Sequence, residues 1–240
     1  MPVVFIHGVP DTHIVWDKVR AQIPNDDAVA LDLPGFSTPV PDGFTATKEE
    51  YVDWIIARLE QLGEPVDLVG HDWGCILTVR VASLRPDLLR TWAAGDAPID
   101  IDYEWHPHAK IWQTPGAGEK WMAAAGAAEW TAGLIAAGVP PTSAAETASY
   151  VDDKMKDCIL RLYRSAVNVG REWEPDLKRI TSPGLVFWGT EDPYCPIEFG
   201  RRLASNAGAR FVDIQAGHWV QQQNPRIVAN ALIEHWRMER

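Results

Sequence analysis

The chain has 240 residues, of which 46% are hydrophobic and 23% are charged, and its formal net charge is −11. This length is enough to bury a sizeable core, so we expect one compact domain with a single insertion. Because the basic residues are scattered along the sequence, we expect no nucleic-acid groove and no binding to an anionic membrane, and a small neutral substrate is favoured.

The cysteines and the N-terminal sequence bear on the compartment. The cysteines at positions 75, 158 and 195 form neither a CxxC pair nor a metal-ligand spacing. We find neither a basic-then-apolar leader nor a long apolar run in the sequence. We therefore expect a reduced, cytoplasmic setting with no membrane span.

The first part of the chain predicts alternating strands and helices. Helical stretches separate short apolar runs, which lie at residues 3–6, 28–31, 66–69 and 91–94. This alternation is typical of a parallel sheet with crossover helices. Residues 47–50 (TKEE) have the form of a capping box and predict a helix that runs through Leu62.

A sharp turn from strand to helix is predicted after the third apolar run. Residues 70–74 (GHDWG) lie between the apolar runs 66–69 and 75–79. Glycines two residues before and after Asp72 let the chain turn sharply and hold the central side chain exposed above the sheet. A carboxylate is already ionised near neutral pH, so it can attack a polarised sp3 carbon without a base. The motif therefore predicts formation and hydrolysis of an alkyl ester.

Residues 97–170 differ from the flanking sequence. They contain no convincing strand and are rich in alanine, tryptophan and glycine, with a second capping-box pattern at residues 143–146. We therefore predict a helical cap over residues 97–170, and a core made of residues 1–96 and 171–240. Alternation of strand and helix resumes near residue 184.

Two later strand ends supply the partners that a carboxylate nucleophile needs. The apolar run 185–188 precedes a loop that carries Asp192, and the alternating run 210–214 precedes His218. Taken alone, Asp192 would be a solvated turn residue and His218 an ordinary loop histidine. The chain order of nucleophile, acid and histidine at three strand ends instead predicts a catalytic triad.

These segments together resemble the α/β-hydrolase superfamily, in particular its aspartate-nucleophile branch of epoxide hydrolases and haloalkane dehalogenases. The resemblance covers nearly the whole chain and rests on five segments, at residues 7–10, 32–37, 70–74, 189–193 and 217–219. It implies an α/β-hydrolase fold, with a mostly parallel sheet flanked by helices and an inserted cap. The chain starts at the strand that leads into His7, so we expect the usual N-terminal strands to be missing or shortened.

The resemblance also implies roles for individual residues. Asp72 would be the nucleophile, and Asp192 would support His218 as the base that activates water. The backbone N–H groups of Val9 and Trp73 would form the oxyanion hole. We expect no cofactor.

We also expect no metal. His106 and His108 flank a proline, but no third ligand lies at a usual spacing from them.

Epoxide hydrolases of this fold use two acidic lid side chains to stabilise the opening oxygen. Residues 157–164 resemble the second lid segment, which makes Tyr163 the expected donor. Residues 108–116 resemble the first lid segment, with His108 where the family usually has a tyrosine. His108 is therefore the expected second donor, and Tyr103 is the reserve candidate.

We predict a small, largely apolar epoxide as the substrate, with water as the second reactant and hydrolysis to a vicinal diol as the reaction. The side chains expected to contact the substrate are His7, Trp73, Tyr103, Trp112 and Trp219. A ligand-binding protein without turnover is a more remote alternative. The sequence leaves the oligomeric state open, with a homodimer as one option.

A haloalkane dehalogenase is the main alternative. Trp73 also matches the halide-binding tryptophan of that group, but Val9 stands where one subgroup has a donating asparagine. A second halide donor would then be a cap tryptophan, chosen from Trp105, Trp112, Trp121 and Trp130.

Overall fold

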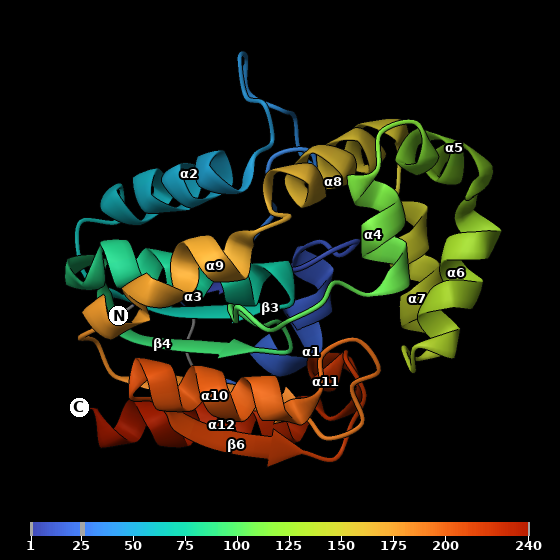
Figure 1. Cartoon of the computed structure of the whole chain (residues 1–240). Coiled ribbons are helices and arrows are strands. Elements are labelled where there is room, and N and C mark those ends of the chain that lie inside the picture. The colour runs from blue at the N-terminus through green and yellow to red at the C-terminus, as the bar shows by residue number, and fades with distance from the viewer. Residues whose placement is uncertain (1, 25–26, 240) are drawn as a thin grey trace.

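A parallel β-sheet forms the centre of the molecule (Figure 1). The computed structural model describes residues 2–24 and 27–239, and in this part of the chain six strands pair in the order β2-β1-β3-β4-β5-β6. Every neighbouring pair is parallel. The strands are β1 (Val3–Ile6), β2 (Ala28–Leu31), β3 (Val66–His71), β4 (Leu89–Gly95), β5 (Gly184–Gly189) and β6 (Arg210–Ile214).

Helices cover both faces of this sheet, which explains why the central strands are apolar almost throughout. Every residue of β1, β3 and β5 is buried. One face packs against α2 (Lys48–Glu60), α3 (Trp73–Leu84) and α10 (Ile197–Ala207). The other packs against α1 (Asp17–Arg20), α11 (Val220–Gln223) and α12 (Pro225–Met238). Short 3-10 helices lie at His13–Trp16, Pro86–Leu88 and Glu174–Arg179.

Five further helices lie between β4 and α9 (Val169–Trp173) in the described part of the chain. They are α4 (Pro107–Gln113), α5 (Ala117–Ala124), α6 (Ala127–Ala136), α7 (Pro141–Ser149) and α8 (Asp153–Ser165). Figure 1 shows the arrows of β4 and β6 pointing toward the side of the molecule where α4 to α7 lie. This cap therefore faces the carboxyl ends of the strands, where parallel sheets place their ligands.

Neither of the two predicted capping boxes forms completely in the structure. The Thr47 side chain does accept a hydrogen bond from the Glu50 backbone N–H, but the Glu50 carboxylate bonds to Thr45 instead of returning to Thr47. The predicted box at residues 143–146 is wrong, because α7 begins two residues earlier with Pro141 in its first turn. Ser143 then lies within the helix, where its hydroxyl accepts a hydrogen bond from Lys18.

Lys48 joins the core to the end of the cap. Its buried ammonium donates to the Ser165 carbonyl at 2.8 Å and lies 2.8 Å from the Glu172 carboxylate. Its backbone N–H also donates to the Ser165 hydroxyl at 2.9 Å. The start of α2 is thereby fixed to the end of α8. Among the described residues, we find no helix long and apolar enough to cross a bilayer.

Replacing Lys48 with methionine is expected to lower the free energy of unfolding by about 1–3 kcal/mol, because the Ser165 carbonyl loses its buried donor. Urea denaturation measures this change. Lys178→Met is the control, since Lys178 is exposed. Equal unfolding free energies for the two variants would contradict a fixing role for Lys48.

Candidate active site

Asp72 lies at the junction of β3 and α3 in a strained backbone conformation. Its φ is 54° and its ψ is −124°, which L-residues rarely adopt. A Cβ at Gly70 would lie 2.0 Å from the Gly74 carbonyl oxygen, and one at Gly74 would lie 2.2 Å from the Ile6 carbonyl oxygen. The turn therefore requires both glycines, and it leaves the Asp72 side chain 14% exposed.

The loop after β1 holds one oxygen of this carboxylate. The backbone N–H of Val9 donates to Asp72 Oδ1 at 2.7 Å. A Cβ at Gly8 would lie only 2.3 Å from the same oxygen, so a glycine is needed for the loop to approach. The backbone N–H of Trp73 also favours the ionised carboxylate. Main-chain donors from two strand ends therefore face Asp72, as in an oxyanion hole.

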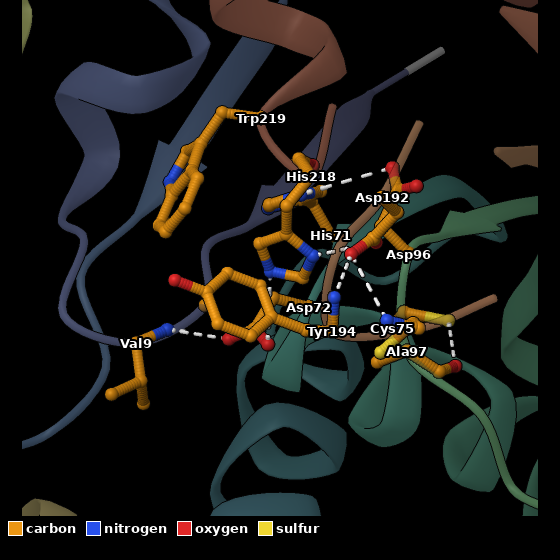
Figure 2. Close-up of polar contacts among 12 residues, drawn as sticks. Val9, His71, Asp72, Cys75, Asp96, Ala97, Asp192, Tyr194, His218 and Trp219 are labelled. Atoms are coloured by element: carbon orange, nitrogen blue, oxygen red, sulfur yellow. Dashed lines mark hydrogen bonds and ion pairs between the residues drawn. The ribbon is translucent and has the colours of Figure 1, made fainter. Parts of the chain in front are cut away.

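The structure brings the three predicted triad residues into contact (Figure 2). His218 Nε2 lies 3.4 Å from Asp72 Oδ2, and His218 Nδ1 lies 2.7 Å from Asp192 Oδ2. The other oxygen of Asp192 accepts hydrogen bonds from the backbone N–H groups of Tyr194 at 2.7 Å and Cys195 at 3.0 Å. Asp192 is thus held rigidly, and it fixes the orientation of the imidazole.

Opposite charges stabilise the buried triad. Burial alone would lower the pKa of His218, but the charge and hydrogen bond of Asp192, joined by those of Asp72, raise this pKa well above its ordinary value. Burial alone would raise the pKa of Asp72, but the hydrogen bond and charge of His218 lower it. The resting site therefore pairs an Asp72 carboxylate with a His218 imidazolium.

Asp72 and His218 open into a cavity of about 500 Å³ beneath the cap. Its wall is mainly aromatic and includes Trp73, Tyr103, Trp105, Trp112, Trp121, Trp130, Tyr163, Tyr194 and Trp219. Four of the five residues expected to contact substrate are in this wall. An apolar guest of modest size suits such a cavity.

His7 is the exception, and the prediction that it contacts substrate is wrong. Its fully buried ring accepts a hydrogen bond from the Leu33 N–H at 3.0 Å and donates one to the Gly8 carbonyl at 2.8 Å. Burial lowers the pKa of His7 to about 4, so the ring is neutral. His7 holds the first loop in place, and it is not among the residues that line the cavity.

The two candidate tyrosines differ in their hydrogen bonds. The Tyr103 hydroxyl donates to the Tyr194 carbonyl at 3.3 Å and accepts from the Cys195 thiol at 3.7 Å. Tyr163 is buried, with its ring centre 5.2 Å from that of Trp73. Burial raises the pKa of Tyr163 well above its ordinary value, and the Asp72 charge acts in the same direction. Tyr163 is therefore a protonated phenol beside the nucleophile.

His106, which the sequence analysis considered only as a metal ligand, lies in the cavity wall near Tyr163. The two ring centres are 6.4 Å apart. His106 Nδ1 accepts a hydrogen bond from the Ala109 N–H at 3.2 Å, so the neutral ring carries its hydrogen on Nε2. Burial lowers the pKa of His106 to about 4, and the Asp72 charge opposes this shift.

His108 also lines the cavity, but it is an exposed residue whose ring stacks on Trp112 at 6.1 Å. The sequence does hold a signal that separates the two histidines. A proline at the first helical position marks the preceding residue, His106, as the N-cap of α4.

Two further buried groups, His71 and Asp96, support the loops that carry His218 and Asp192. His71 Nε2 donates to the His218 carbonyl at 2.7 Å. Asp96 accepts a hydrogen bond from the Gly189 N–H at 2.7 Å. Burial raises the pKa of Asp96 well above its ordinary value, and the charge of Asp192 adds to this shift.

Cys195, Asp192 and His218 have ligand atoms within 4.8 Å of one another. The hydrogen bonds described above account for this cluster without a metal.

An aspartate at the turn from strand to helix, main-chain donors that face it and an acid–histidine pair together match a hydrolase of α/β architecture. The chain belongs to the alpha/beta hydrolase family, whose model matches residues 3–231. This finding confirms the family resemblance and the fold predicted from sequence.

Similar proteins within this fold have different activities. The chain is 25% identical to (E)-2-((N-methylformamido)methylene)succinate hydrolase of Acinetobacter baylyi, over 98% of this chain and 89% of that protein. It is 24% identical to an epoxide hydrolase of Caballeronia sordidicola, over 98% of this chain and 87% of that protein. The crystal structure of haloalkane dehalogenase DbeA from Bradyrhizobium elkani superposes with a TM-score of 0.78 at 19% identity, covering 99% and 91% of the two chains. The reaction must therefore be argued from the site.

Asp192→Asn is expected to lower the pKa of His218, because the variant loses the negative charge that favours the imidazolium. NMR titration of the imidazole resonances measures the shift. Asp32→Asn is the control, because Asp32 pairs with His13 instead. If the pKa of His218 were the same in Asp192→Asn as in the wild-type protein, the ion-pair account of the site would be wrong.

Proposed function

We propose that the protein hydrolyses epoxides to vicinal diols through a covalent ester on Asp72. The observation that carries this proposal is the residue at the turn between β3 and α3. It is a carboxylate instead of a serine hydroxyl, and it lies 3.4 Å from His218. A carboxylate in this position forms an alkyl ester, which the neighbouring histidine and a water molecule can hydrolyse. Two family members named above as similar, an epoxide hydrolase and a haloalkane dehalogenase, support this class of chemistry.

The geometry assigns different tasks to the two oxygens of Asp72. Val9 holds Oδ1, which leaves Oδ2 to attack an epoxide carbon in the cavity. As the new C–O bond forms, the ring C–O bond breaks, and its electron pair goes to the ring oxygen. Tyr163 then donates a proton to this oxygen, and the proton that His218 releases after ester formation returns through solvent to the phenolate. Oδ1 becomes the ester carbonyl oxygen and already lies at its main-chain donor.

Ester formation prepares His218 for the second step. The ester is neutral, so one of the two negative charges that raise the pKa of His218 disappears. The imidazolium can then release its proton and act as a base. It takes a proton from water, whose oxygen attacks the ester carbonyl, and the N–H groups of Val9 and Trp73 hold the oxyanion. Collapse of this intermediate breaks the bond between the acyl carbon and the alkyl oxygen. The departing alkoxide takes the second proton of the attacking water, which releases the diol and leaves an Asp72 carboxylate beside the His218 imidazolium.

We propose Tyr163 and His106 as the two groups that stabilise the opening oxygen. Both lie in the wall beside Asp72, and both are protonated, uncharged donors near neutral pH. His108 is the weaker candidate because it is exposed. The Tyr103 hydroxyl already donates to a backbone carbonyl. The wall around them favours a small apolar epoxide.

Haloalkane dehalogenation is the second candidate, and the indole groups of the cavity favour it. Trp112 and Trp130 carry buried indole N–H groups that lack a hydrogen-bond partner among the described residues. Such groups suit a halide. These nitrogens have almost no accessible surface, however, so a halide in the cavity cannot reach them without side-chain movement. Free, buried cysteines also support our proposal of a reducing, cytoplasmic setting.

His218→Gln is expected to accumulate the Asp72 ester, because alkylation proceeds while the base for hydrolysis is missing. Intact-mass analysis after reaction with an aryl epoxide would show a gain equal to the whole epoxide. A bromoalkane would instead add only its alkyl group. The double variant Asp72→Asn/His218→Gln is the control, and an adduct that persists in it would refute Asp72 as the nucleophile.

Tyr163→Phe is expected to slow ester formation with an aryl epoxide by about 10²-fold, the usual effect of losing one donor to a developing oxyanion. Single-turnover quench measurements give this rate. Bromoalkane alkylation should change by less than about threefold, because no oxygen is protonated in that reaction. Equal losses with both substrates would contradict a proton-donor role.

The two cap histidines can be separated by matched substitutions. His106→Asn keeps a favoured N-cap residue for α4 but moves the donor, so we expect about a tenfold loss in the rate of ester formation. His108→Asn should leave that rate within about threefold of wild type. The reverse ranking would assign the role to His108.

A further inference from the structure

A buried carboxyl group outside the triad lies on the loop that holds Asp72. Asp11 follows Val9 by two residues and is 1% exposed. Its Oδ2 accepts a hydrogen bond from the indole Nε1 of Trp219 at 2.9 Å. Its backbone N–H donates to the Gly8 carbonyl at 3.2 Å, which closes the turn around Val9. Neither the nucleophilic attack nor the hydrolysis described above uses this carboxyl group.

The partner of Asp11 is the residue directly after the catalytic histidine. The Trp219 ring meets the His218 imidazole edge-on, with ring centres 4.7 Å apart and planes at 82° (Figure 2). Trp219 is 5% exposed and also lines the cavity. The hydrogen bond between Asp11 and Trp219 therefore links the loop after β1 to the loop after β6, across a sequence separation of 208 residues.

We propose that the Asp11–Trp219 pair is a positioning device for the hydrolytic half-reaction. Hydrolysis requires His218 Nε2 and the Val9 N–H to be correctly placed around the same ester. These two groups belong to the two loops that the Asp11–Trp219 pair connects. Alkylation needs the Asp72 carboxylate, which Val9 holds, and the cap donors, but it needs no base at His218 Nε2. The pair therefore acts on the breakdown of the ester, and this inference rests on the proposed covalent mechanism.

The environment of Asp11 makes asparagine a close substitute. Burial raises the pKa of Asp11 to about 7, and the charge of Asp72 adds to this shift, while the Trp219 hydrogen bond and His218 oppose it. Near neutral pH a substantial fraction of the carboxyl groups is therefore uncharged. Asparagine retains an uncharged acceptor oxygen of the same reach, whereas alanine removes the acceptor.

The test measures the two half-reactions separately with an aryl epoxide, by rapid quench and intact-mass analysis of the full-length protein. For Asp11→Ala and Trp219→Phe we expect ester hydrolysis to slow by about 10–100-fold and ester to accumulate, because small displacements of catalytic groups have effects of this size. Alkylation by Asp11→Ala should stay within about threefold of wild type, while Trp219→Phe, whose ring lines the cavity, is compared on the hydrolysis step alone. Asp11→Asn should recover most of the hydrolysis rate.

Asp67→Asn is the matched control, because Asp67 is a buried carboxylate at the amino end of β3, outside the cavity lining, where it accepts a hydrogen bond from Thr91 at 2.6 Å. It should leave both rates unchanged. The inference is overturned if Asp11→Ala and Trp219→Phe hydrolyse the ester at the wild-type rate, or if Asp11→Ala slows both steps equally. The proposed mechanism fails separately, if His218→Gln forms no adduct at all.

Discussion

The strained backbone of Asp72 is the constraint on which the rest of the site depends. A residue at φ 54° and ψ −124° costs of order 1–3 kcal/mol, so the surrounding structure must hold it there. The glycines at positions 70 and 74 allow β1, β3 and α3 to approach closely enough to do so, and the Asp72 N–H donates to the Gly95 carbonyl at 3.0 Å. Only in this conformation does the carboxylate lie between the Val9 N–H and the His218 imidazole.

Charge balance within the buried site follows from this placement. Asp72 and Asp192 flank a single imidazolium, and this arrangement lets the triad remain ionised where burial alone would neutralise it. Asp11 and Asp96 lack a direct cationic partner among the described residues, and burial raises the pKa of each. The buried carboxyl groups therefore have two different roles. Asp72 and Asp192 carry charge, whereas Asp11 and Asp96 accept hydrogen bonds and position loops. The chemistry proposed for Asp72 removes its negative charge, and the loss of this charge lowers the pKa of the neighbouring His218.

The parts of the site that lie at strand ends could be predicted from sequence, because parallel strands place their carboxyl ends at one edge. Apolar runs and the glycines around residue 72 were sufficient to predict that Asp72, Asp192 and His218 would meet. The role of His7 was mispredicted, because an imidazole next to a strand end can turn inward and bond to the backbone. Asp11 was missed for a related reason. Its partner, Trp219, is more than 200 residues away in the sequence, and no local sequence pattern indicates such a contact.

The cap shows why residue type alone does not decide a catalytic role. Tyr103 and Tyr163 both line the cavity, and both have raised pKa values through burial, so they are equally protonated near neutral pH. They differ in what their hydroxyl groups already bind, since that of Tyr103 is committed to the Tyr194 carbonyl. A hydroxyl that must first break such a bond contributes less to a transition state than one that does not already donate its proton. The same comparison separates His106 from His108, since burial and a single capping hydrogen bond fix the ring of His106 and its protonated nitrogen. The chemistry of this site is therefore set by the prior hydrogen bonds of its wall, which only the three-dimensional structure reveals.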